Sequence, residues 1–191
     1  MNYKELIHIA FSLISSPARA WEEIRLEEDK QRVYTVFVYP MIGLCGLSVF
    51  IGALLSNDWS GAASFQYAMT QCCAVAVSLF GGYFLAAWAI DEMGRRFFDL
   101  PADIALARRF AGYALVILFV LQIITGILPD FGIIALFVEF YTVYIVWEGS
   151  VRMMHVSEKL RLRFTILSSI LLIACPALVR LLFNELSVVL S

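Results

Sequence analysis

Apolar residues fall in five long runs along the chain, and short polar segments separate the runs. We expect membrane-spanning helices over about residues 33–55, 65–90, 110–128, 132–149 and 164–184. Each run holds enough residues to cross a hydrocarbon core of about 30 Å at about 1.5 Å per residue. The pattern therefore predicts an all-α integral membrane protein, built as a five-helix transmembrane bundle over residues 33–191.

The third and fourth runs flank a short Leu-Pro-Asp-Phe-Gly break at Leu128–Gly132. Because the break has almost no length, these two spans are predicted to form an antiparallel hairpin. Glu139 lies near the middle of the fourth run. An ionisable side chain in hydrocarbon is costly, so Glu139 is a candidate functional residue.

Residues 1–32 are too polar to cross a membrane and are predicted to form an amphipathic interfacial region. Apolar side chains gather on one side of residues 1–15, as in a helix that lies in the plane of the membrane. Ser16 and Pro17 suit the N-cap and the first position of a second helix. The acidic run Glu27–Asp29 is expected to be a solvated end.

Two further sets of residues suit roles in the membrane. Large apolar side chains that we expect to anchor in the membrane interface are Phe11, Trp21 and Trp59. Small residues recur every four positions in the second span, at Ala74, Ser78, Gly82 and Ala86. Such a stripe lets a neighbouring helix approach closely, and internal packing is favoured over a homodimer seam.

Lysine and arginine concentrate in alternate connecting segments. Residues 1–32 hold five, residues 91–109 hold four and residues 148–163 hold four, whereas the intervening turns hold none. The positive-inside rule therefore predicts a cytoplasmic N-terminus and a C-terminus outside. Within residues 91–109 we expect a short interfacial helix before the third span.

Composition narrows the function classes. The chain is 61% apolar with a mean hydropathy of +0.82, against about 45–50% apolar for soluble domains. A net charge of −2 without a basic aromatic patch argues against a nucleic-acid partner. The four cysteines lack CxxC spacing and the two histidines form no ligand motif, so no metal or cofactor site is expected. No catalytic motif is present, which predicts a protein that is not an enzyme.

Polar residues in four of the spans fall in the outer half of the bilayer once the orientation is set. These residues are Gln71, Gln122, Thr125, Glu139 and Arg180. Three interpretations stay open: hydrogen bonding between helices together with a Glu139–Arg180 ion pair, an outward-facing polar cavity, or Arg180 reaching alone to the outer surface. The depths of Glu139 and Arg180 along the bilayer normal predict that they pair.

Several short segments resemble a known family. They are Pro17-Ala-Arg-Ala-Trp21, Phe110-Ala-Gly-Tyr-Ala114, Trp147-Glu-Gly-Ser150 and Met154-His-Val-Ser-Glu-Lys159. Together with the order of the spans, they resemble the bacterial type of the YIP (Ypt-interacting protein) domain family. The resemblance implies a five-span bundle with a cytoplasmic N-terminus, a location in the bacterial inner membrane, and no catalytic residues.

Two functions remain in competition. One is a membrane scaffold or adaptor that binds other membrane proteins or organises lipid. The other is a small transporter, or a lipid- or solute-binding protein, that uses a polar cavity around Glu139 and Arg180. A tightly packed, dry outer half would favour the scaffold, and a lipid or other density bound between the outer halves of the spans would favour binding.

Overall fold

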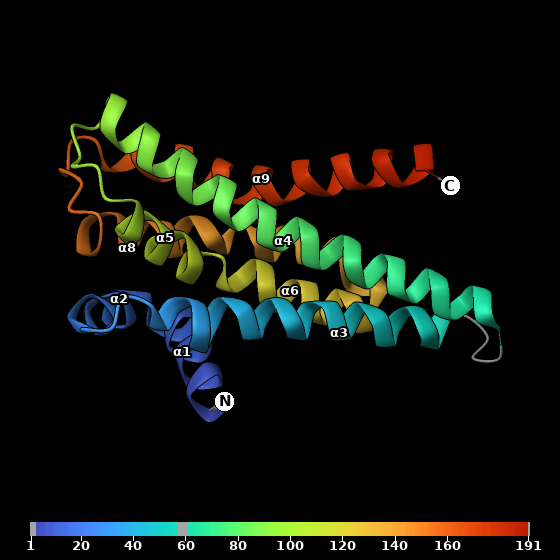
Figure 1. Ribbon diagram of the computed structural model, residues 1–191. Helices are drawn as coiled ribbons and strands as arrows, with labels where there is room; N and C mark the ends of the chain where they lie inside the picture. The colour runs from blue at the N-terminus through green and yellow to red at the C-terminus, as the bar shows by residue number, and fades with distance from the viewer. Residues whose placement is uncertain (1–2, 57–60, 191) are drawn as a thin grey trace.

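The computed structural model describes residues 3–56 and 61–190, and within them every regular element is helical (Figure 1). Five helical stretches are long and apolar enough to cross a membrane: Val33–Ser56, Ala62–Phe97, Ile104–Ile127, Pro129–Arg152 and Arg161–Leu186. Each overlaps one predicted span, so the all-α, five-span fold is confirmed.

The spans are built from the following helices. Helices α1 (Tyr3–Ser15) and α2 (Pro17–Leu26) precede the first span. The first span joins the π-helix η1 (Val33–Val38) to α3 (Tyr39–Ser56), and the second is α4 (Ala62–Phe97). The third joins α5 (Ile104–Ala114) to α6 (Val116–Ile127), and the 3₁₀ turn η2 (Pro129–Phe131) leads to α7 (Gly132–Glu139) and α8 (Tyr141–Arg152), which form the fourth. The fifth is α9 (Arg161–Leu190).

The spanning helices run roughly along one long axis, and the two longer connectors between them lie at one end. In Figure 1, α4 lies between α3 and α9, and α6 packs against α3. Helix α2 and the connectors at residues 98–103 and 153–160 lie at the left of Figure 1, which we call the connector end. The C-terminus lies at the opposite end.

The first span widens into a π-helix just before Pro40. The N–H group of Tyr39 donates to the carbonyl of Tyr34, five residues earlier, which is the hydrogen bond of a π-helix. Proline has no N–H group, and its ring crowds the carbonyl four residues before it. A wider turn relieves that crowding, so η1 directly precedes the proline.

The prediction of a separate interfacial helix within residues 91–109 is wrong, because α4 continues to Phe97. Arg95 pairs with Asp91 at 3.6 Å and also with Glu92, at the spacings that stabilise a continuing helix. The chain then turns through Asp99, at a φ of 52°. Asp103 caps the next helix, its carboxylate accepting from the N–H of Leu106 at 3.0 Å.

The small residues of α4 are buried, and Gly82 among them lies at the contact with α9. Ala74, Ser78, Gly82 and Ala86 are all buried. A Cβ atom at Gly82 would lie 2.4 Å from the Cα of Pro176 on α9, so only glycine permits this approach. A second close crossing joins α3 to α6, where a Cβ at Gly52 would lie 1.7 Å from the carbonyl oxygen of Gly126.

The N-terminal helices dock on the bundle through Trp21. Its ring stacks on Phe110 at 5.4 Å between centroids, and its Nε1 donates to the carbonyl of Ile145 at 2.9 Å. Gly149 leaves room for the ring, because a Cβ there would lie 2.6 Å from Trp21 Cε2. Trp21 is therefore enclosed by protein and fully buried, which corrects its predicted role as a membrane-interface anchor.

The two glycines Gly52 and Gly43 of α3 offer a matched test of the close crossing. We expect Gly52→Ala to lower the free energy of unfolding by on the order of 1–3 kcal/mol, because the methyl group would force α3 away from α6. Gly43 has nothing within 4 Å of its Cβ position, so Gly43→Ala should be neutral or stabilising by about 0.5–1 kcal/mol. Denaturant unfolding in mixed micelles measures both. Equal effects of the two substitutions would contradict the crossing.

Candidate functional site

A cavity of about 390 Å³ lies between α4, α6, α7 and α9. Its polar lining side chains are Ser78, Gln122, Thr125, Glu139 and Arg180. The rest of the lining is leucine, isoleucine, alanine, glycine and proline. Binding sites for small molecules commonly have volumes of about 300–1,000 Å³ with a few polar groups in an apolar lining, so the cavity has the size and character of such a site.

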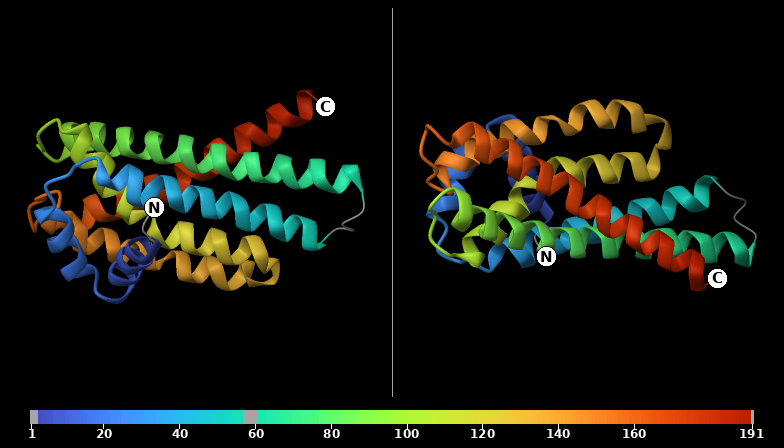
Figure 2. Two further views of the ribbon diagram at one scale, coloured as in Figure 1. Left: turned by 60° about the horizontal axis from the view of Figure 1, so that its bottom comes forward. Right: turned by 90° about the horizontal axis from the view of Figure 1, so that it is seen from above.

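The path of α9 creates this space. At the connector end α9 starts beside α8, where the Arg161 guanidinium lies over the Trp147 ring at 4.0 Å. Further along, Pro176 meets Gly82, so α9 follows α4. The right-hand view of Figure 2 shows α9, in orange to red, crossing away from the α6–α7 hairpin. The cavity lies where α7 and α9 separate.

Four of the five polar residues predicted to share a layer line this one cavity. Gln122 and Thr125 come from α6, Glu139 from α7 and Arg180 from α9. Gln71 does not line the cavity, and α4 contributes Ser78 instead. The structure thus brings together polar groups from four of the spans.

The predicted ion pair between Glu139 and Arg180 is not formed. Among the residues that the structure describes, neither side chain lies within 4.0 Å of an opposite charge. The two residues occur on spans that are consecutive in sequence, but α9 packs along α4 and so leaves α7. The depths of the two residues along the spans did not reveal this sideways separation.

The cavity holds polar groups that the protein itself does not satisfy. The Thr125 hydroxyl donates to the Leu121 carbonyl at 2.8 Å, and the Ser78 hydroxyl donates to the Val75 carbonyl at 2.8 Å. Within residues 3–56 and 61–190, the side chains of Gln122, Glu139 and Arg180 make no hydrogen bond or ion pair. An amide, a carboxylate and a guanidinium therefore remain available to a ligand.

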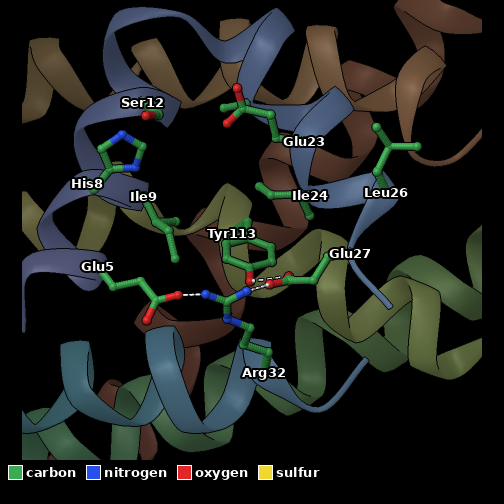
Figure 3. A pocket seen from close by; sticks show the side chains of 11 residues that line it. Glu5, His8, Ile9, Ser12, Glu23, Ile24, Leu26, Glu27, Arg32 and Tyr113 are labelled. Carbon is green, nitrogen blue, oxygen red and sulfur yellow. Dashed lines mark hydrogen bonds and ion pairs between the residues drawn. The ribbon is translucent and has the colours of Figure 1, made fainter. Parts of the chain in front are cut away.

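A second cavity, of about 330 Å³, lies between the N-terminal helices and the starts of the spans (Figure 3). Arg32 lies between two carboxylates in this view, pairing with Glu5 and with Glu27, the latter at 2.5 Å. The Tyr113 hydroxyl donates to Glu27 Oε2 at 3.4 Å. These charges satisfy one another, so we interpret this cluster as a clamp that holds α1 and α2 on the bundle.

Two members of this region were missed from the sequence. Glu27, expected in a solvated end, is partly buried; burial raises the pKa of its carboxyl, while the charge of Arg109 and the Tyr113 hydrogen bond oppose the rise. Arg109, expected in a basic connector, is buried, and its Nη2 donates to the Ile24 carbonyl at 2.6 Å. No local spacing signals these contacts, because the partners lie more than 80 residues apart in the chain.

Of the two remaining residues predicted to anchor in the membrane interface, one is exposed and the other is not described by the structure. Phe11 is 68% exposed on α1, on the same side as Tyr3 and Ile7. Trp59 lies outside the described residues. In the part of the chain that the structure describes, no group of three histidine, cysteine or acidic residues could hold a metal ion, and the four cysteines are unpaired.

Comparison with known proteins gives one match. A family model described as "Yip1 domain" matches residues 11–180, from α1 to Arg180 in the cavity. No curated protein and no solved structure matches the chain.

A double-mutant cycle tests the separation of Glu139 from Arg180. We expect the losses of unfolding free energy in Glu139→Gln and Arg180→Gln to add, with a coupling below about 0.5 kcal/mol, because the two groups are not in contact. The cycle Glu27→Gln with Arg32→Gln is the control, since that ion pair is formed and should give a larger coupling. A larger coupling for Glu139 with Arg180 than for the control would contradict the geometry described here.

Proposed function

The chain belongs to the Yip1 domain family, and we propose that this membrane protein binds the polar headgroup of a lipid in the cavity between α4, α6, α7 and α9. The observation that carries the proposal is the presence of two charged side chains, Glu139 and Arg180, that line this cavity without a partner in the described residues. The proposal assigns no catalytic step and no cofactor.

The two charges suit the opposite ends of a zwitterionic headgroup. A guanidinium is a strong donor to phosphate oxygens, and a carboxylate accepts from an ammonium or hydroxyl group. An isolated charge near the middle of a bilayer costs about 2.5–3.5 kcal/mol on insertion scales. A ligand that neutralises both Glu139 and Arg180 would remove much of that cost, and Gln122 offers a further donor and acceptor.

The helices around the cavity favour a lipid over a water-soluble solute. On α7, Leu136 is 64% exposed and Phe137 is 74% exposed, and on α9 Leu181 is 65% exposed. Such side chains suit contact with acyl chains. A lipid already in the bilayer could therefore move between α7 and α9 with its tails remaining in hydrocarbon.

A scaffold or adaptor role for other membrane proteins is the second candidate. It is favoured by α1, whose Tyr3, Ile7 and Phe11 are each more than half exposed although the same helix is docked on the bundle through other residues. A protein partner or the membrane interface would cover this apolar side. The interfacial role of residues 1–32 belongs to the same proposal.

Arg180 provides the direct test of headgroup binding. We expect purified wild-type protein to retain phospholipid through detergent extraction, and Arg180→Gln to retain about tenfold less or lower still, because a hydrogen bond to a charged group contributes about 1.5–3 kcal/mol. Native mass spectrometry together with phosphate analysis of the purified protein measures the bound lipid.

Arg163→Gln is the matched control, since Arg163 is an exposed arginine on the same helix outside the cavity. Its lipid content should equal that of the wild type. Equal lipid content in all three proteins would refute headgroup binding. Retention of a protein partner without bound lipid would favour the scaffold instead.

We also propose that the connector end faces the cytoplasm of a bacterial cell, with the protein in the inner membrane. The three segments rich in lysine and arginine support this orientation, since the helices that carry them meet at the connector end (Figure 1).

Cysteine labelling tests the orientation. In a background without the four native cysteines, Ala63→Cys at the start of α4 should react in intact cells with a thiol reagent that does not cross membranes. Ala102→Cys, in the connector before α5, should react only after the cells are opened. Both positions are exposed in the structure, so a difference reports sidedness. The reverse pattern would overturn the orientation.

A further inference from the structure

Four buried hydroxyl groups on the last two spans have no hydrogen-bond partner among the described residues. They are Thr142 on α8 and Thr165, Ser168 and Ser169 on α9. Each of these residues is at most 3% exposed. Neither the headgroup proposal nor the packing of the bundle accounts for them.

The four differ from other hydroxyls of the bundle. Ser78, Thr125 and Ser150 each donate to a carbonyl three or four residues earlier in their own helix. A buried hydroxyl without a hydrogen-bond partner lowers the stability of the fold. Four such hydroxyls occur on two helices in contact, so their costs add. Bound water is the usual partner of otherwise unsatisfied polar groups in a protein interior.

Helical spacing puts three of these hydroxyls on the faces that line the cavity. Thr142 follows Glu139 by three residues, about one turn closer to the connector end. Thr165 and Ser169 precede Ile173 by eight and four residues, and Ile173 lines the cavity. The hydroxyls therefore continue two walls of the cavity toward the connector end.

Thr165, Ser169 and Ile173 form a row at a spacing of four residues along α9. Arg161, four residues before Thr165, begins this row. The Nη2 of Arg161 donates to the Trp147 carbonyl at 3.1 Å, so α8 and α9 are in contact there. One turn away, the fully buried ring of Phe164 lies against Phe98 and Phe110, at 5.2 Å and 6.0 Å between centroids. The aromatic cluster gives the row a closed end.

We propose that the seam between α8 and α9 binds a string of water molecules, which extends the cavity from Glu139 toward Arg161 and ends at Phe164. Between Glu139 and Arg161 the polar groups of the seam are hydroxyls without charge, so its ligand is water and not a free ion. The inference does not depend on the headgroup proposal, because the hydroxyls need partners whether or not a lipid occupies the cavity.

Water-edited solid-state NMR of the protein in lipid bilayers tests the inference, because it follows magnetisation from water into nearby protein sites. Signals of Thr142 and Ser169 should grow several-fold faster than those of Ile170. Ile170 is the matched control, being adjacent to Ser169 and 55% exposed on the apolar outer side of α9. Growth of Thr142 and Ser169 as slow as that of Ile170 would mean a dry seam and would overturn the inference.

Substitution of the α9 hydroxyls makes the test specific to the seam. The double variant Thr165→Val with Ser169→Ala keeps nearly the same side-chain volumes and should abolish the fast growth at Thr142. Thr70→Val is the control, since Thr70 is exposed on α4 and its hydroxyl donates to the Gln66 carbonyl. Unchanged chemical shifts elsewhere verify that both variants fold. Fast growth at Thr142 that persists in the double variant would place the water elsewhere and would also overturn the inference.

Discussion

The close contact of α4 with α9 determines the rest of the arrangement. Lipid tails are as apolar as leucine, so spans associate through tight packing of small residues rather than through the hydrophobic effect. At Gly82 the backbone of α4 reaches Pro176 directly, and α9 follows α4 from there on. That choice of partner takes α9 away from α7 and leaves α7 with a largely exposed surface. Tight packing at one helix pair thus produces the polar space beside another.

The five spans could be predicted from the sequence because hydropathy measures how well a helical segment tolerates the hydrocarbon core. A chain in hydrocarbon must satisfy its backbone hydrogen bonds within helices, so run length and polarity suffice to locate them. The shared surroundings of Gln122, Thr125, Glu139 and Arg180 were also predictable, since polar groups are rare at that depth. The predicted ion pair between Glu139 and Arg180, in contrast, is not formed. Residue count fixes depth along a span, whereas the sideways position of Glu139 relative to Arg180 depends on which helices pack together.

The N-terminal contacts show a second limit of sequence patterns. An apolar side on a short helix indicates that this side is covered. The pattern does not distinguish cover by lipid from cover by protein. Trp21 was assigned to the membrane interface, yet its ring fits against Phe110 and the space left by Gly149. Glu27 was likewise assigned to a solvated end and Arg109 to a connector, because their partners lie on distant segments. Only the assembled bundle brings these groups together.

The docking of Trp21 also has a consequence for the order of events during synthesis. Its hydrogen-bond acceptor, Ile145, lies 124 residues later in the chain. At about 5–20 residues per second, the ribosome needs roughly 6–25 s to make that segment. Helix α2 therefore exists well before its site on α8, and the contact of Trp21 with Ile145 is one of the last to form. Until then, the apolar sides of α1 and α2 lack the later parts of the bundle that cover them in the finished fold.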